Sequence, residues 1–168
     1  TRPMNDGEFP DWGNPIGEMM YETLRYFAGE TTPTTDFYDA SMTVDDGLGL
    51  PKVGTWTDPY STYPSCAKPF MLVISDIYPT YDSDTLPGTA FGAMGATSLG
   101  DGGSLNVSTL ADKIFTGELS TGNRFIGQNS TTDDGACTEK SVDGFDDIRG
   151  LCPEEPTKQG SYYSAAVA

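Results

Sequence analysis

The stretch "AKPFMLVISDIYPTYDSD", residues 67–84, decides how this chain is expected to fold. It contains a continuous apolar run, Phe70 to Ile74, which ends at Ser75 and Asp76 and is followed by proline, tyrosine and more acids. A continuous apolar run bounded by turn signals is typical of a strand that is covered on both faces of a parallel sheet. The sequence therefore predicts a buried strand over residues 69–75 that stops at an aspartate.

A helix is predicted on the N-terminal side of this strand, in "GNPIGEMMYETLRYFAGE", residues 13–30. Asn14 suits the N-cap position and Pro15 the first helical position, where no backbone N–H is needed. Gly29 can adopt the left-handed conformation that ends a helix. The expected helix spans about 15 to 28, and its apolar residues at helical spacing are Ile16, Met19, Met20, Leu24 and Phe27.

The remaining pattern completes an alternation of helices and strands. "NVSTLADKIFTGEL", residues 106–119, predicts a second amphipathic helix capped by Asn106; "RFIGQ", 124–128, predicts a short strand; and a last helix is expected from near Gly160. This order predicts an α/β fold with an open, mainly parallel sheet and flanking helices. Two strands are too few for a sheet, so further strands are expected outside the chain or in the long loop insertion at 30–65.

Charge and composition exclude several classes of function. The chain has 25 acidic and 9 basic residues, a net charge of -16, so it lacks the basic face that nucleic acids require. No apolar run is long enough for membrane insertion. The chain has no histidine, which excludes Ser-His-Asp and Cys-His catalysis and histidine-ligated zinc. Most of the acids are interpreted as solubilising groups, and cation binding by some of them is the alternative.

The three cysteines are Cys66, Cys137 and Cys152. Cys137 and Cys152 flank fourteen residues with little regular pattern, and a disulfide there would close the acidic loop at 129–159. The chain-entropy model gives such a link about 3 kcal/mol. Free thiols in a cytosolic protein are the alternative, but the low lysine content and many small polar residues favour an exported protein with the disulfide. Cys66 is then unpaired or has a partner outside the chain.

Polar residues from two segments, Asn14 from one and Ser75 and Asp76 from the other, meet at one predicted edge of the sheet. Ligands of open α/β sheets bind at the carboxyl ends of the strands, where Ser75 and Asp76 are expected. Asn14 begins the helix that we expect to pack beside this strand, and a helix N-terminus carries partial positive charge. Together they can frame a small cation, a water network or the carboxylate of a partner. The competing interpretation is purely structural: Asp76 caps the following turn and Asn14 caps the helix.

Other features are interpreted as structural. The acids in Tyr81–Asp84 and Asp143–Gly150 are expected to be solvated loop residues, because neither stretch has the spacing of a calcium-binding loop. Met19 and Met20 are expected in the core. The aromatic residues between 37 and 63 are expected to pack the insertion onto the sheet.

The two stretches around the predicted edge resemble parts of a known fold. "GNPIGEMMYETLRYF" resembles the second motif segment of von Willebrand factor A-type domains, and "FMLVISDIYPTYDSD" resembles their aspartate-ended strand. Together with further stretches, including "FIGQ", "DGACTEK" and "RGLCPEEPTKQGSYYSAAVA", they resemble the PilC/PilY family of type IV pilus tip proteins. The resemblance covers most of the chain. It implies that residues 1–168 are a single fragment of a von Willebrand A-like domain.

The resemblance also implies a function and a site. It implies a non-enzymatic pilus assembly and adhesion protein at the cell surface, associated with the pilus tip and outer membrane. Its partners would be minor pilus subunits, a host or abiotic surface and the rest of its own polypeptide. Asn14, Ser75 and Asp76 would contribute to a Mg²⁺ or Ca²⁺ site that is incomplete here, because the D-x-S-x-S motif of the fold is missing. "DASMT", residues 39–43, is the nearest string and is interpreted as loop.

Two rival interpretations remain. An exported hydrolase acting on polysaccharide through carboxylates predicts two acids at catalytic separation in one cleft. A purely structural piece that holds a filament cap together predicts that its loops are buried in an assembly.

Overall fold

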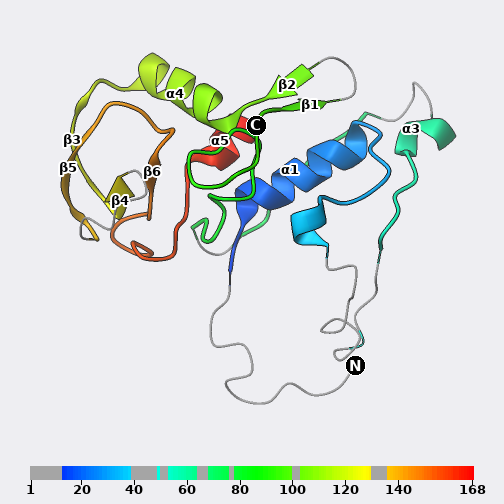
Figure 1. Ribbon diagram of the computed structural model, residues 1–168, viewed down its shortest axis with the longest axis horizontal. Coiled ribbons are helices and arrows are strands. Elements are labelled where there is room, and N and C mark those ends of the chain that lie inside the picture. The colour runs from blue at the N-terminus through cyan, green and yellow to red at the C-terminus, as the bar shows by residue number, and fades with distance from the viewer. Residues whose placement is uncertain are drawn as a thin grey trace.

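The computed structural model describes residues 13–38, 49, 53–63, 68–75, 78–99, 103–129 and 136–168. Asp76, Cys66 and the string at 39–43 lie outside these residues, so the predictions about them stay predictions. Figure 1 shows three helices, α1, α5 and α4, side by side across the middle of the molecule, with the longest strands, β3 and β5, at one end.

The helix predicted after Asn14 is present as α1, Ile16–Phe27. Gly29 has φ +82°, as expected of a glycine that ends a helix. The prediction that Asn14 caps the helix is wrong: Pro15 occupies the N-cap position, and the Asn14 side chain bonds to a distant turn. Met19 is 61% exposed and is not a core residue, because the buried face of α1 carries Gly17, Glu18 and Tyr21.

The second predicted helix is confirmed as α4, Val107–Glu118, which is capped as expected. Oδ1 of Asn106 accepts a hydrogen bond from the Thr109 backbone N–H at 2.9 Å. The last helix is α5, Tyr163–Val167, and it packs against both α1 and α4. Figure 1 shows α5 between the other two, so it joins two helices that are far apart in the sequence.

The long insertion predicted at 30–65 contains two short helical turns among its described residues. These are η1, Thr35–Phe37, and α3, Pro59–Thr62, whose N-cap Asp58 accepts a hydrogen bond from the Tyr60 backbone N–H. Phe37 packs against the core, and Trp56 meets the Tyr26 ring edge-on at 5.9 Å. Both rings contact the rest of the chain, but the predicted packing of the insertion onto a sheet stays a prediction.

The sheets among the described residues are small and antiparallel. β1, Thr97–Leu99, pairs with β2, Gly103–Leu105, and β3, Gly122–Ile126, pairs with β5, Thr138–Val142. β4, Gln128–Asn129, pairs with β6, Ile148–Arg149. The strand predicted at 124–128 is therefore interrupted: the Gly127 N–H bonds to the Gly150 carbonyl at 2.9 Å, and pairing moves to a new partner. The open parallel sheet stays a prediction.

The segment 68–75, predicted as a buried strand, is extended but has no strand partner among the described residues. Phe70, Leu72 and Ile74 are 83%, 82% and 85% exposed, while Met71 and Val73, on the alternate side, are less so at 40% and 47%. For the chain by itself the prediction of burial is wrong, because no described residue covers the side chains of Phe70, Leu72 and Ile74. Met71, Leu72, Val73 and Ile74 all border an open hollow of about 250 Å³ beside α1.

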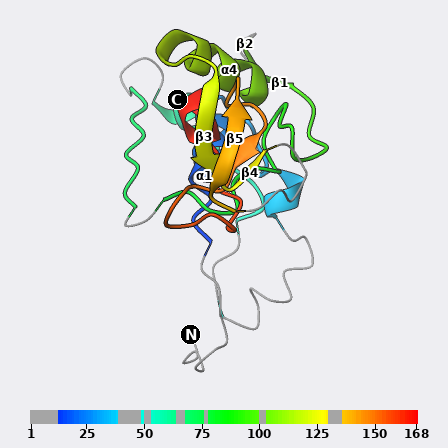
Figure 2. The same ribbon diagram turned by 90° about the vertical axis from the view of Figure 1, so that its left-hand side faces the viewer.

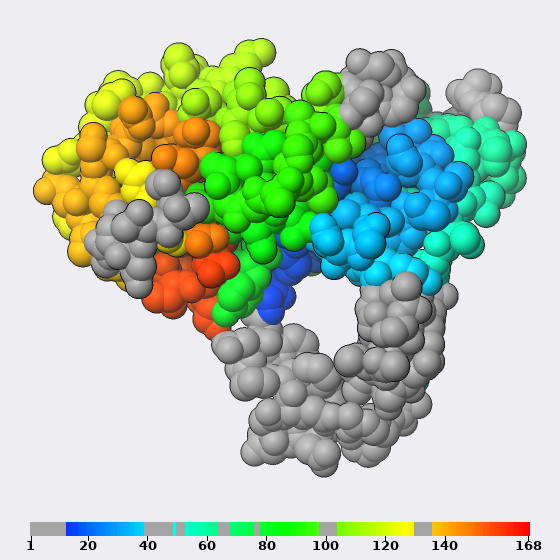
Figure 3. All heavy atoms as spheres, in the orientation of Figure 1, coloured from blue at the N-terminus to red at the C-terminus, as the bar shows by residue number. Residues whose placement is uncertain are grey.

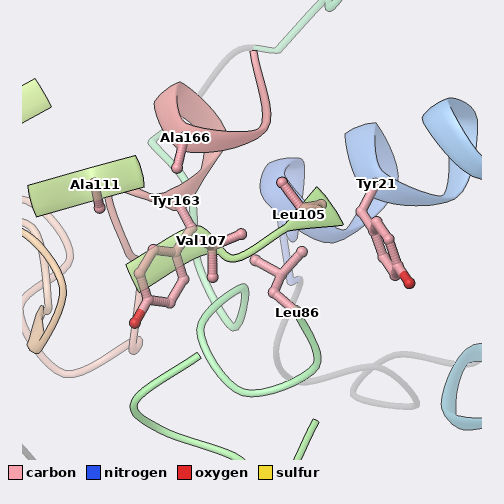
Figure 4. Packing of buried hydrophobic residues seen from close by; sticks show 7 residues of the cluster. All are labelled: Tyr21, Leu86, Leu105, Val107, Ala111, Tyr163 and Ala166. Atoms are coloured by element: carbon pink, nitrogen blue, oxygen red, sulfur yellow. The ribbon is translucent and has the colours of Figure 1, made fainter. Parts of the chain in front are cut away.

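The core lies where α1, α4 and α5 meet. Figure 4 shows Tyr163 and Val107 at its centre, with Leu86 and Leu105 between them and α1. A second, smaller cluster lies under the β3–β5 hairpin and consists of Phe115, Ile126, Val142 and Ile148. Figure 2 shows the hairpin from outside, with α4 running along its top. Phe115 and Val107 both belong to α4, so this helix connects the two clusters.

The acidic loop predicted at 129–159 contains the expected disulfide, Cys137–Cys152. It is also more ordered than predicted, because β5 and β6 both lie within it. Ile148 is 2% exposed, and burial raises the pKa of Asp146 and Asp147. The prediction that 143–150 is a solvated loop is therefore wrong.

Candidate functional site at the start of α1

The predicted edge begins with a direct contact between Asn14 and the end of the extended segment. Nδ2 of Asn14 donates a hydrogen bond to Oγ of Ser75 at 2.7 Å and a second to the Tyr78 carbonyl at 3.2 Å. The start of α1 and the end of the apolar segment therefore share one edge, as the sequence predicted. Asp76 follows Ser75 directly but lies outside the described residues.

The backbone of Asn14 is fixed by Thr80. Its N–H donates to Oγ1 of Thr80 at 2.7 Å, and its carbonyl accepts the Thr80 N–H at 3.0 Å, which forms an isolated antiparallel bridge. Ser75, Tyr78 and Thr80 are thus all bonded to Asn14, just before α1. Sequence reasoning missed Thr80, because nothing in the sequence indicates a bridge between residues 66 positions apart.

A buried acid lies beside this edge. Asp82 is fully buried; its Oδ1 accepts the Ser161 N–H at 2.6 Å and its Oδ2 the Gly17 N–H at 3.4 Å. Oγ of Ser161 also donates to the Asp82 carbonyl. Asp82 therefore connects the first turn of α1, where the helix has unsatisfied N–H groups, to Ser161, which lies two residues before α5. The prediction that the acids of 81–84 are all solvated is wrong for Asp82.

Burial changes the acidity of this site. It raises the pKa of Asp82 to about 6, although the N–H groups of Ser161 and Gly17 favour the ionised form. Burial also raises the pKa of Glu18, in the first turn of α1, to about 7, and the neighbouring Asp84 and Asp82 add to this effect. The Thr85 N–H donates to Glu18 at 3.2 Å and opposes the shift. Two carboxyl groups next to the helix start therefore titrate near neutrality.

The described side chains at this edge, those of Asn14 and Ser75, offer neutral oxygen and nitrogen groups. The buried acids Asp82 and Glu18 lie beside them. In the part of the chain that the structure describes, no group of three or more Cys, Asp and Glu side chains is arranged to hold a metal ion. Asn14 and Ser75 alone offer neutral ligands, whereas Mg²⁺ and Ca²⁺ need six or more oxygens, several of them charged. These two residues are suited to part of such a site and require carboxylates from elsewhere.

Two further acids, Asp112 of α4 and Asp146, lie close to each other. Asp112 raises the pKa of Asp146 by its charge and by a shared hydrogen bond, in addition to the effect of burial. The hollow under the β3–β5 hairpin, of about 280 Å³, is lined by aromatic and aliphatic side chains and Arg124, and neither acid is among its lining residues.

Comparison with known proteins defines the family. The model of the second domain of PilY1 homologs matches residues 1–168, which is the whole chain. The chain belongs to this family. It is also 45% identical over 182 residues to the type IV pilus biogenesis factor PilY1 homolog of Xylella fastidiosa (strain Temecula1 / ATCC 700964). That alignment includes 100% of this chain and 12% of the relative, so the chain spans about an eighth of the relative's length.

No solved structure matches the chain. Among the described residues, no helix has the length and apolar character needed to cross a membrane.

Proposed function

We propose that this chain is part of a von Willebrand A-like domain in a non-enzymatic type IV pilus assembly and adhesion factor at the cell surface. Family membership and the name of the Xylella relative support a role in pilus biogenesis. The observation that supports the binding site is the contact between Asn14 and Ser75, which brings the helix start and the end of the apolar segment to one edge. Partners would be minor pilus subunits and a host or abiotic surface.

The sheet of this domain would be completed by the rest of the polypeptide. Phe70, Leu72 and Ile74 form a row of exposed apolar side chains on an extended segment, and exposing such a row to water is costly. Strands from the part of the protein that this chain does not include would pair with the segment, and a second layer would cover the row. α1 would remain next to the segment, across the hollow that Met71, Leu72, Val73 and Ile74 border.

Hydrogen exchange tests the sheet. In the full-length protein, the amides of residues 70–74 are expected to be strongly protected, since they would be bonded to neighbouring strands. The Leu72→Asp variant should lose this protection, whereas Leu119→Asp, on an exposed residue that follows α4, should keep it. Rapid exchange at 70–74 in the full-length protein would refute the completed sheet.

The proposed edge would bind a partner through Mg²⁺ or Ca²⁺, held by Asn14, Ser75 and Asp76 together with carboxylates from outside this chain. Calorimetric titration of the full-length protein with each ion tests this, with Asp76→Ala as the variant and the exposed Asp84→Ala as the control. We expect the heat of binding to disappear only in Asp76→Ala. Equal heats in all three proteins would end the metal proposal and leave direct contact by the edge.

A further inference from the structure

Arg149 is held by neutral partners in an acidic chain. Its Nε donates to Oε1 of Gln128 at 2.7 Å, its Nη1 donates to Oγ of Ser83 at 3.2 Å, and its Cζ lies 4.5 Å from the centre of the Phe91 ring. The chain carries 25 acidic residues, yet within the described ranges no carboxylate forms an ion pair with this guanidinium. Burial lowers the pKa of Arg149, and the nearby Asp84 only partly offsets this effect.

Arg149 is half-buried, and partial removal from water without a directly paired carboxylate costs some free energy, so the arrangement needs an explanation. A guanidinium has five N–H donors in a planar fork that matches a carboxylate. Among the described residues, the hydrogen bonds of the Arg149 guanidinium come from Nε and Nη1. The ring of Phe91 and the two neutral acceptors fix the plane of the fork without neutralising its charge.

A hollow of about 280 Å³ adjoins Arg149. Its polar lining comes from Gln128, Thr157 and Gln159, and Ala136 stands at its exposed rim. Among the residues that the structure describes, none of those that line it is acidic. A space of this size suits one amino-acid side chain or the end of a peptide.

The walls of this hollow are rigid. Arg149 belongs to β6, which pairs with β4 on one side and forms a bridge to Ser161 on the other. The Gly150 N–H bonds to the Gly160 carbonyl at 2.7 Å, and a side chain at Gly127 or Gly150 would overlap the Pro156 carbonyl. The Cys137–Cys152 disulfide closes the same region. Because the backbone that carries Arg149 is held by these contacts, little ordering of the protein is needed when a ligand binds.

We propose that this hollow binds a single carboxylate of a peptide, either an acidic side chain or a free C-terminus, through the guanidinium of Arg149. A polyanion is an unsuitable ligand, because this hollow offers the single cation Arg149. The rest of the surface, in a chain of net charge -16, repels further negative charge. A group with one negative charge meets the least repulsion and matches the fork. The site is separate from the edge at Asn14 and does not depend on the function proposed for that edge.

Saturation-transfer difference NMR on the full-length protein tests this, because the method detects weak ligands of large proteins. The probes are N-acetylglutamate α-amide, which has a side-chain carboxylate, N-acetylalanine, which has a terminal one, and the neutral N-acetylalanine amide. We expect a saturable signal from at least one acid and none from the amide. The acid that gives the signal identifies the source of the carboxylate.

Variants locate the binding. Arg149→Lys keeps the charge but loses the fork, and we expect the signal to fall at least fivefold. Ala136→Phe fills the rim without touching Arg149 and should have the same effect, so it decides the test if Arg149→Lys fails to fold by circular dichroism. Arg124→Lys, on β3 and outside the lining of this hollow, is the control and should change nothing. Equal signals from the acids and the amide, or signals unaffected by Ala136→Phe, would overturn the proposal.

Discussion

Nδ2 of Asn14 lies 2.7 Å from Oγ of Ser75, a residue 61 positions further along the chain. This bond connects Asn14, two residues before α1, to the last described residue of the apolar segment. Figure 3 shows the first residues of α1, in dark blue, emerging beside the green atoms of the central part of the chain. The contact brings together two segments that are far apart in the sequence, and its contribution to stability can be measured.

A double-mutant cycle on Asn14→Ala and Ser75→Ala measures this contact. Because the bond is exposed to solvent, we expect each single variant to lose about 0.5–1 kcal/mol and the coupling between them to be about 0.5 kcal/mol. Urea unfolding provides the free energies. Thr116→Ala, on an exposed position of α4, serves as the unrelated partner and should be additive with Asn14→Ala. Additivity between Asn14 and Ser75 would show that the bond contributes nothing to stability.

Removing the Asp82 carboxyl should be among the most damaging single changes. In Asp82→Ala the N–H groups of Ser161 and Gly17 lose their buried acceptor, which we expect to cost about 2–4 kcal/mol. Asp82→Asn keeps one acceptor oxygen and should cost less. The matched control is Asp84→Asn, an exposed acid two residues away, with a change below about 0.5 kcal/mol. A small effect of Asp82→Ala on the urea midpoint would contradict the assigned role.

Glu18 should make the chain more stable in mild acid. Its pKa in the folded state, about 7, lies above its ordinary value of 4.5, so its stabilising contribution is complete below pH 4.5 and is lost as the pH rises through 7. Asp82, with a folded pKa of about 6, acts in the same direction.

Glu18→Gln isolates this contribution, since glutamine keeps an acceptor for the Thr85 N–H. We expect the variant to gain about 1–2 kcal/mol relative to the natural chain between pH 5 and pH 8, after allowance for the partial hydration of Glu18. Thermal unfolding across this range gives the comparison, with Glu118→Gln, at the exposed end of α4, as the control. Parallel pH profiles for the natural chain and Glu18→Gln would rule the explanation out.

The hydroxyl of Tyr163 should stabilise the core. It contacts the Asp146 carbonyl, accepts the Ala90 N–H at 3.2 Å and lies 3.3 Å from Oγ of Ser108. Tyr163→Phe leaves these groups without a partner in a buried place, so we expect a loss of about 1–3 kcal/mol.

The neighbouring Tyr162 provides the control for that variant. It stacks on Phe145 at 4.5 Å through its ring, and Tyr162→Phe keeps the ring. We expect a change of less than about 0.5 kcal/mol. If the two variants unfold at the same urea concentration, the hydrogen bonds of Tyr163 have no net effect.

Replacing both Cys137 and Cys152 by serine should cost about 3 kcal/mol, because the link closes a loop over a separation of 15 residues. The loss should be largest around β6, whose neighbours the disulfide restrains. Hydrogen exchange resolves this by region, and uniform destabilisation of the whole chain would argue against a local role.

The sequence by itself determined the elements that depend on local chemistry. Asn106 caps α4 because its side chain reaches an N–H three residues away, and Gly29 ends α1 because only glycine adopts a positive φ without strain. The pairing of Cys137 with Cys152 followed from their spacing and from a composition that favours an exported protein. Family membership followed from long, distinctive stretches and was confirmed by the match over the whole chain.

Only the tertiary structure decided which polar groups are buried and which apolar groups are not. Asp82 looks like a loop acid in the sequence, and it is buried because the first turn of α1 and Ser161 supply N–H groups from positions that no local pattern connects. Asn14 was placed on the right edge for the wrong reason: its side chain bonds to Ser75 rather than to its own helix. The run at 70–74 has the composition of a buried strand, yet burial also requires partners, and these depend on segments that meet only in space.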